Sequence, residues 1–396
     1  MRAPGAAARV VFLKECRESL RDRRVLLNAL LIGPLLGPLL FVVLLRLTVS
    51  RQLEQAVRPL PVAIVGAARA PNLVADLQQQ GLQVLDGGGA DPQQAVRSQR
   101  VALALRIPAS YAADWRAGRP AQLEIFYDSS RRDTGPALQR LRAMLDSYAQ
   151  RTAAMRLMVR GLAPTLTTPL LLAGRDQATA RGRGALLFAM LPYFLIMSSL
   201  VGGMWLAIDS TAGERERASL EPLLINPVPR DRILLGKVLA TCAFNFASLT
   251  LALLAFLVAG YFLPAAQMGV SFSFGPGVIG SILPVMMPLV LLIVVAQILV
   301  TAFARSTREA QTYLGLLQLL PIIPSVVLSL LPIHSRLWMY AVPLLGQQLS
   351  IMQLLRGEAL APGPTVLSAL ATLLLAAAAF WAARRNYETE RLAISV

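Results

Sequence analysis

Residues 211–237 read TAGERERASLEPLLINPVPRDRILLGK, the most charged short segment in the apolar part of the chain. Apolar runs flank this segment on both sides, at residues 185–208 and 238–263. A polar segment between two membrane spans must lie at one face of the bilayer. Residues 211–237 therefore predict a surface loop between two transmembrane helices, and the rest of the chain can be ordered around it.

The pattern within this loop predicts a short helix followed by a break. Thr211 and Glu214 have the Thr-x-x-Glu spacing of a capping box. The Asn-Pro-Val-Pro sequence at residues 226–229 would end such a helix. Three basic residues follow where the chain returns to the membrane: Arg230, Arg232 and Lys237. Basic residues at that position indicate the cytoplasmic side.

Composition excludes an ordinary soluble protein. Hydrophobic residues make up 55% of the chain and charged residues only 15%. Several apolar runs reach the roughly 18–20 residues that cross a bilayer as a helix. The net charge of +16 would also fit a nucleic-acid-binding protein, but such proteins do not carry membrane-length apolar runs. In a membrane protein the positive excess indicates orientation and attraction to anionic lipid.

The apolar runs predict six transmembrane helices, at residues 25–45, 185–208, 238–263, 279–304, 312–331 and 365–381. The first run is longer than the apolar core of a signal peptide, and no small-x-small cleavage pattern follows it, so we expect it to be retained. Before it, Leu13, Cys16 and Leu20 fall on one face of an expected helix that lies in the membrane interface.

Between the first two runs the composition becomes that of a soluble domain. Residues 61–65, 101–107 and 123–127 have the pattern of strands. Residues 71–80 predict a helix, and a second, long helix begins near Thr134. An apolar stripe on the long helix favours packing on the domain's own sheet over a coiled coil. The domain has neither Cys nor His, which excludes disulfides and thiol- or imidazole-ligated metal sites within it.

Charge in the short loops predicts the topology. Residues 264–278 carry no charged side chain, whereas Arg305 and Arg308 follow the fourth run and Arg384 and Arg385 follow the sixth. This alternation places both termini in the cytoplasm and the soluble domain outside. In the last outer loop, the apolar segment at 344–355 predicts a re-entrant or interfacial helix.

The predicted fold is an α-helical polytopic membrane protein, with six transmembrane helices and an α+β extracytoplasmic domain inserted between helices 1 and 2. The expected ranges are an interfacial amphipathic helix at 1–24, transmembrane helix 1 at 25–46, the outer domain at 47–184, transmembrane helices 2–6 at 185–384 with a cytoplasmic loop at 209–237, and a cytoplasmic tail at 385–396.

The loop resembles the first cytoplasmic loop of ABC-2 permeases, the membrane subunits of type-2 ATP-binding-cassette transporters. The matching residues are Glu214, Arg215, Glu216, Arg217, Ser219, Leu220, Glu221, Pro227, Leu234, Leu235, Gly236 and Lys237. Ala218 stands where these permeases usually have Gly, and Pro222 follows Glu221 where a helix-compatible residue is common. One span, a large outer domain and five further spans also resemble the sodium-exporting and drug-exporting group of these permeases.

The resemblance implies a permease subunit of an ATP-driven exporter in a bacterial inner membrane. A separate cytoplasmic ATPase would carry ATP and Mg, and a second permease copy or a sister permease would complete the path. The implied coupling residues are Thr211, Glu214, Arg215, Glu216, Arg217, Ser219 and Glu221, with Arg230, Arg232, Gly236 and Lys237 at the loop end. Membrane lipid is a further expected partner, and nucleic acid is not.

The residues themselves predict no catalytic centre, metal site or directly bound cofactor. A P-loop needs Gly-Lys-Ser/Thr at its end, but Val238 follows Gly236 and Lys237. His334 is the only histidine, so a two-histidine zinc motif is impossible, and we interpret His334 as a surface residue rather than the base of a serine hydrolase. Cys16 and Cys242 both fall on the cytoplasmic side of the predicted topology, which argues against a structural disulfide.

Polar residues within the spans leave the cargo open. The cores of spans 2–6 contain no Asp, Glu, Lys or Arg, which disfavours the alternative of an ion-coupled secondary transporter. A membrane-anchored sensor whose outer domain binds a partner is a third possibility. Asn245, Gln297 and Gln318 predict helix–helix hydrogen bonds or, as the alternative, contacts that line a path. The uncharged spans favour an amphipathic or lipophilic cargo over sodium.

Overall fold

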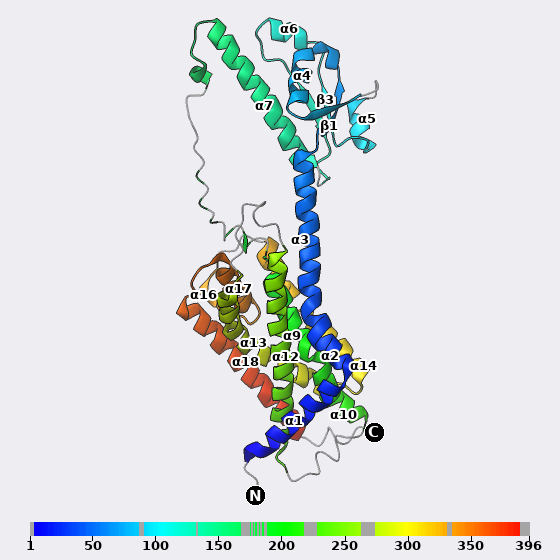
Figure 1. The fold of residues 1–396 in the computed structure, drawn as a ribbon, viewed down its shortest axis with the longest axis vertical. Coiled ribbons are helices and arrows are strands. Elements are labelled where there is room, and N and C mark those ends of the chain that lie inside the picture. Colours follow the sequence, from blue (N-terminus) through cyan, green and yellow to red (C-terminus); the bar gives the residue numbers. More distant parts are fainter. Residues whose placement is uncertain are drawn as a thin grey trace. The chain divides into compact units, whose positions relative to one another are not determined.

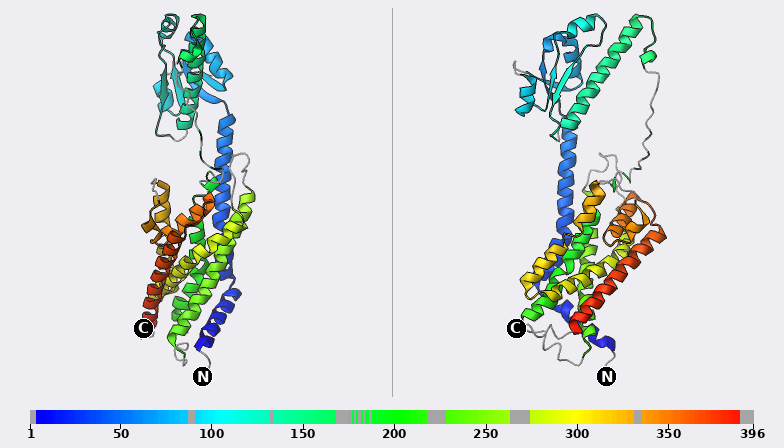
Figure 2. Two further views of the ribbon diagram at one scale, coloured as in Figure 1. Left: turned by 90° about the vertical axis from the view of Figure 1, so that its left-hand side faces the viewer. Right: turned by 180° about the vertical axis from the view of Figure 1, so that it is seen from behind.

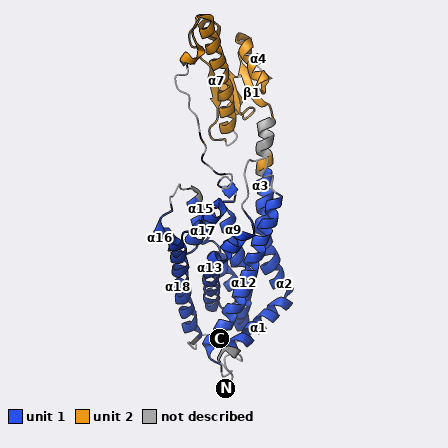
Figure 3. Ribbon diagram, turned by 60° about the vertical axis from the view of Figure 1, so that its left-hand side comes forward, with its two compact units in different colours: residues 1–48, 177–396 blue, residues 49–176 orange. Residues whose placement is uncertain are grey.

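The computed structural model of the protein describes residues 4–86, 91–131, 134–167, 188–217, 228–262, 274–330 and 335–388, and six positions from 175 to 185. The chain forms two compact units, one of residues 1–48 and 177–396 and the other of residues 49–176 (Figure 3). Each unit is described by itself below.

Six helices among the described residues are long and apolar enough to cross a membrane: Leu27–Leu47, Leu191–Glu216, Arg230–Tyr261, Pro276–Phe303, Thr307–Leu328 and Pro362–Tyr387. Each overlaps one of the six predicted spans. The predicted fold class is thereby confirmed. The first, fifth and sixth spans are largely exposed, as expected for helices that face lipid or a partner.

The larger unit begins with α1 (Pro4–Arg21), α2 (Arg23–Leu26), the π-helical η1 (Leu27–Ile32) and the first part of α3 (Gly33–Val57), whose last residues belong to the smaller unit. It continues with α9 (Leu191–Ile208), the π-helical η4 (Asp209–Gly213) and α10 (Glu214–Glu216), which follow one another without a break. The remaining helices are α12 (Arg230–Tyr261), α13 (Pro276–Phe303), α14 (Thr307–Leu317), α15 (Ile322–Leu330), α16 (Leu337–Tyr340), α17 (Leu345–Arg356) and α18 (Pro362–Glu388) (Figure 1).

Helix α9 is the centre of the larger unit and packs against α12 and α13. Its glycines allow a close approach: a Cβ at Gly203 would lie 2.7 Å from Thr241 Cγ2 and 2.8 Å from Asn245 Cγ. Small residues at such crossings let membrane helices pack backbone to backbone. A large apolar cluster that includes Leu195, Phe256 and Ile282 fills the space between these helices.

Proline and local polarity shape the last helices. Pro321 lies between α14 and α15, where its missing amide hydrogen interrupts the ladder of the fifth span. The predicted helix at 344–355 is present as α17. Leu344, immediately before it, has φ of +72°, a conformation that L side chains rarely adopt, and its amide donates to Gln347 Oε1 at 2.9 Å.

The smaller unit contains a four-stranded sheet in the order β2-β1-β3-β4. Its strands are β1 (Leu60–Val65), β2 (Leu82–Asp86), β3 (Leu103–Arg106) and β4 (Glu124–Tyr127). β1 pairs in parallel with β2 and β3, and β4 pairs antiparallel with β3. The helices are α4 (Pro71–Gln79), α5 (Pro92–Arg97), α6 (Tyr111–Arg116) and α7 (Thr134–Val159), besides the short 3-10 turns η2 (Ala67–Arg69) and η3 (Pro164–Thr167).

Three of the four strands were predicted, and β2 was not. The first half of α7 packs into the core of the sheet through Leu138, Leu141 and Met144, which agrees with the interpretation that its apolar stripe covers the domain's own sheet. Tyr111, Trp115 and Tyr148 stack in series beside this core, with ring centroids 5.5 Å and 5.8 Å apart. Burial raises the pKa of Tyr111 to about 12, with the neighbouring Tyr148 adding to the shift.

Candidate coupling site

The candidate site is the junction of α9, η4 and α10 with α12 and α1. Of the predicted loop, residues 209–217 and 228–237 are described. Ser219 and Glu221, two of the expected coupling residues, lie outside the described residues. The left view of Figure 2 shows α1 beside the beginning of α12.

The predicted capping box at Thr211 is wrong. Thr211 lies inside a continuous helix, because α9 runs through the π-helical turn η4 into α10. Its hydroxyl donates to the carbonyl of Ala207 at 2.5 Å, the i−4 bond that threonine makes inside helices. Gly213, before α10, has helical φ and ψ rather than the extended geometry of an N-cap. The second span therefore ends at Glu216 instead of Ile208.

A buried cluster of opposite charges lies where this extension meets α12. Lys237 is fully buried, and its ammonium donates to Glu214 Oε2 and to the carbonyl of Ser210. Glu214, only 6% exposed, also accepts a bond of 2.9 Å from Lys14 Nζ through its second carboxylate oxygen. One carboxylate thus joins a lysine of α1 to a lysine of α12.

Helix α1 contributes a second buried carboxylate, Glu15, which is 3% exposed and lies 3.3 Å from Lys14 Nζ. Burial raises the pKa of Glu15, although the nearby charges of Lys237 and Lys14 favour its ionised form. Partial burial of Lys14 works against its ammonium form, but the hydrogen bond to Glu214 and the nearby carboxylates outweigh it and raise the pKa of Lys14. Both effects follow from bringing charged groups together out of water.

Gly236 explains how α1 comes so close to α12. A Cβ at Gly236 would lie 2.7 Å from Val11 Cβ and 2.8 Å from the carbonyl oxygen of Ala8. The face of α1 that is buried runs through Ala8, Val11, Glu15 and Ser19. Leu13 and Leu20, on the predicted apolar face of α1, are exposed, as side chains that face lipid would be, and the helix packs on α12 through the other face.

Arg215 and Glu216 connect the same junction to two more helices. Arg215 donates to the carbonyls of Ala304 and Ala302 at 2.9 Å each, at the end of α13. Glu216 Oε2 accepts from the backbone amide of Thr307, the first residue of α14, at 3.0 Å. Arg217 reaches back to the carboxylate of Asp209 at 2.5 Å. Arg215 and Glu216 thus bind the neighbouring helices α13 and α14, and Arg217 binds Asp209 in its own segment.

The loop-end arginines are divided between two locations. Arg230 donates to the carbonyl of Tyr387 near the end of α18 at 3.1 Å. Arg232 lies on another face of α12, with Asp231 Oδ2 3.9 Å from its Nε. The junction therefore contacts α1, α12, α13, α14 and α18.

The three polar residues that were candidates for a path converge on one turn of α9. Asn245 packs over Gly203, and neither of its amide atoms has a hydrogen-bond partner among the described residues. Gln297 donates to the carbonyl of Leu200 at 2.6 Å, and Gln318 lies 3.1 Å from Met204 Sδ. Asn245 and Gln297 are completely buried between helices. The hydrogen bond of Gln297 matches the helix–helix interpretation. Neither Asn245 nor Gln297 lines either of two cavities in the larger unit.

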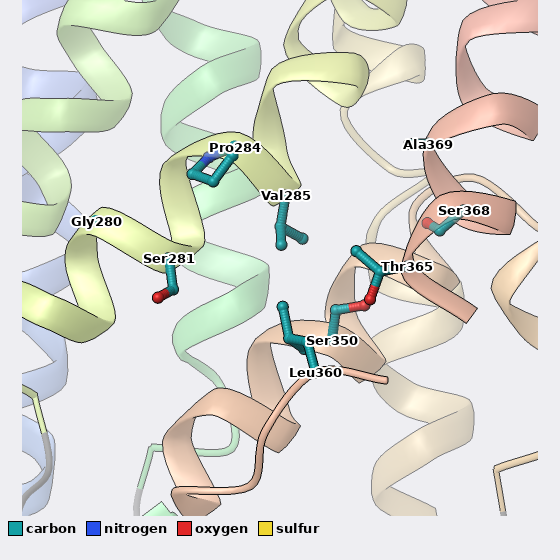
Figure 4. A pocket seen from close by; sticks show the side chains of 9 residues that line it. All are labelled: Gly280, Ser281, Pro284, Val285, Ser350, Leu360, Thr365, Ser368 and Ala369. Carbon is teal, nitrogen blue, oxygen red and sulfur yellow. The ribbon is translucent and has the colours of Figure 1, made fainter. Parts of the chain in front are cut away.

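Two cavities lie elsewhere in the larger unit. One of about 380 Å³ lies between α13, α17 and α18 and carries hydroxyl groups at Ser281, Ser350, Thr365 and Ser368 (Figure 4). Another, of about 310 Å³, is lined almost wholly by apolar residues, including Leu289, Leu317 and Leu344. Neither cavity is lined by a charged side chain of the described residues.

Comparison with known proteins decides the family. The model of the family described as "ABC-2 family transporter protein" matches residues 29–385, most of the chain. This chain belongs to the ABC-2 transporter family. It is 27% identical over 376 residues to the "ABC transporter permease protein NatB" of Bacillus subtilis (strain 168), a match that covers 94% of this chain and 95% of that protein. No solved structure matches the chain significantly.

For an ABC-2 permease, the charge cluster is the feature that sequence reasoning missed. Lys237 was assigned to the loop end, and Lys14 and Glu15 to a basic interfacial helix. The available signal was the position of Lys237 at the start of a long apolar run, since an ionisable residue within a span requires a partner of opposite charge. The loop motif offers Glu214 as such a partner, and the structure pairs it with Lys237.

Proposed function

We propose that this ABC-2 permease is the membrane subunit of an ATP-driven exporter and couples to a separate cytoplasmic ATPase through residues 211–226. The observation that carries the proposal is the set of hydrogen bonds that join Glu214, Arg215 and Glu216 to four other helices. A permease without its own nucleotide site must receive work through a contact that is ordered and joined directly to its spans. The extension of α9 meets both conditions.

In this proposal Glu214 has a structural role. Glu214 is buried and paired within the chain, so its carboxylate does not face a partner. Its role in the proposal is to fix α1 and α12 to the extension of α9. An ATPase that moved the loop would then move α9, α12 and α13 together, and these helices form the core of the larger unit.

A coupling variant tests this proposal. Arg215→Gln removes the charged fork that binds the end of α13. We expect the ATPase to remain bound to the permease, while cargo-stimulated ATP hydrolysis falls at least tenfold because the loop no longer drives α13; a charged hydrogen bond contributes about 1.5–3 kcal/mol. The measurement is hydrolysis by the co-purified complex in proteoliposomes.

Arg356→Gln is the control, since Arg356 is an exposed arginine in the last turn of α17, outside the loop motif. If cargo stimulates ATP hydrolysis in Arg215→Gln as much as in the wild type, the contact between Arg215 and α13 is not needed for coupling. Failure of the unaltered permease to co-purify with any ABC ATPase, or to transport when ATP is supplied, would overturn the proposed function itself.

We also propose that both termini are cytoplasmic and that the unit of residues 49–176 lies outside, from the alternation of basic loops. A single cysteine at Gln150, an exposed position of α7, should react with an impermeant maleimide on intact cells. A cysteine at Arg308, in the first turn of α14, should react only after the membrane is permeabilised. Labelling of position 308 from outside would reverse the topology.

A further inference from the structure

A cleft of about 430 Å³ lies between α1 and the beginning of α12. Its lining residues are Ala8, Arg9 and Phe12 from α1, and Arg232, Leu235 and Leu239 from α12. The cleft lies beside the α1–α12 crossing at Gly236. No residue of the charge cluster lines it, and the loop contributes only Arg232 and Leu235.

The lining is graded from charged to apolar along α12. Arg232, Leu235 and Leu239 follow one face at spacings of three and four residues. At 1.5 Å of rise per residue, Arg232 and Leu239 are separated by about 10 Å along the helix axis. Leu239 is 45% exposed on a helix that is apolar enough to span a membrane. The apolar end of the cleft therefore continues into the lipid-facing surface of α12.

The charged residues that line the cleft are two arginines, Arg9 and Arg232. No acidic residue lines it, and among the described residues Arg9 has no ion-pair partner. Arg232 has Asp231 at 3.9 Å, too far for a hydrogen bond between the two side chains. Two guanidinium groups above an apolar floor match an anion that carries hydrocarbon chains, because arginine binds phosphate oxygens in bidentate geometry.

We propose that this cleft binds an anionic phospholipid, with its phosphate at Arg9 and Arg232 and its acyl chains along Phe12, Leu235 and Leu239. A soluble phosphate compound would leave the apolar floor in water, and an acidic protein surface would not follow the leucine face into the membrane. A lipid bound there contacts both α1 and α12. It would therefore stabilise the crossing of these helices at Gly236, which brings Lys14 of α1 to Glu214. The inference rests on the membrane-spanning character of α12 and is independent of the ATPase.

Native mass spectrometry of the purified full chain, titrated with phosphatidylglycerol and separately with phosphatidylcholine, tests the assignment. We expect tighter binding of phosphatidylglycerol, and an affinity at least tenfold lower in the double variant Arg9→Gln/Arg232→Gln. Arg17→Gln is the matched control, since Arg17 is an exposed arginine on α1 outside the cleft. Glycerol phosphate, the headgroup without chains, should not displace the lipid.

Several outcomes would overturn the assignment. An equal loss of phosphatidylglycerol affinity in Arg17→Gln would indicate that α1 is attracted to any anionic surface without a specific site. Equal binding of phosphatidylcholine would remove the role of the charge, and displacement by glycerol phosphate would indicate a site for a soluble anion. If the double variant bound phosphatidylglycerol normally but lost its ATPase, the cleft would serve a protein partner. Monodisperse elution of each variant, with an unchanged unfolding temperature in detergent without added lipid, establishes that the losses are local.

Discussion

Replacing Glu214 with glutamine should destabilise the larger unit by about 3–5 kcal/mol, the typical cost of leaving a buried charge without its partner. The substitution keeps the shape of the side chain but leaves the ammonium of Lys237, which is fully buried, without its carboxylate. Replacing Lys237 with methionine should cost less, about 1–2 kcal/mol, because Glu214 keeps its 2.9 Å bond to Lys14. Unfolding in mixed detergent, followed by circular dichroism, measures both.

The double variant Glu214→Gln/Lys237→Met separates charge from packing. With the buried ammonium also removed, we expect stability to recover most of what the single glutamine variant loses, since a buried ion pair contributes little more than an apolar pair of similar volume. Glu18→Gln is the control, because Glu18 faces Lys14 at 3.5 Å but is 58% exposed, and exposed pairs contribute at most about 1 kcal/mol. Simple additivity of the two single losses would show that Glu214 and Lys237 do not act as a pair.

The asymmetry of this cluster has a consequence for coupling. Lys14 and Lys237 share the two oxygens of the Glu214 carboxylate, and Glu15 adds a second carboxylate at 3% exposure. A force on α10 would be carried to α1 and α12 through charged hydrogen bonds in a region that excludes water, where such bonds are strongest. The loop motif therefore contributes contacts that hold the helices together.

The parts of the fold that depend on local sequence patterns could be predicted, and the parts that depend on contacts between distant residues could not. The spans were predictable because the bilayer imposes a length of apolar chain, and β1, β3 and β4 because alternation is a local signal. β2 was missed: the alternation in Leu82–Asp86 breaks at Leu85, and the segment leads directly into a glycine tract, so its strand character depends on parallel pairing with β1.

Thr211 shows where a local motif fails. Thr-x-x-Glu spacing occurs both at a helix start and inside a helix, and only the conformation of the preceding residues decides between them. Here α9 is already helical when it reaches Asp209. The bond from Lys14 to Glu214 joins residues 200 positions apart, and it depends on the crossing of α1 and α12, which the sequence pattern does not contain.

Replacing Gly236 with valine should release α1 from α12. The new Cβ would overlap Val11 and the backbone carbonyl of Ala8, and a backbone atom cannot rotate away as a side-chain tip can. Overpacking of this kind typically costs about 1–3 kcal/mol, and here α1 can escape it by moving. We therefore expect loss of the Lys14–Glu214 contact and of the coupled ATP hydrolysis, in a permease that still inserts into the membrane.

Cys16 reports this release directly. Burial raises the pKa of its thiol, with the nearby charge of Glu15 adding to the shift, and the thiolate is the form that reacts. In a Cys242→Ala background, Gly236→Val should therefore increase the rate of maleimide labelling at Cys16 on the order of tenfold, as expected for a local opening. Gly260→Val is the matched control in the same helix, because nothing lies within 4 Å of a Cβ there. If Cys16 reacts at the same rate in both valine variants, α1 is not held at Gly236, and the proposed route from the loop through Glu214 to α1 is wrong.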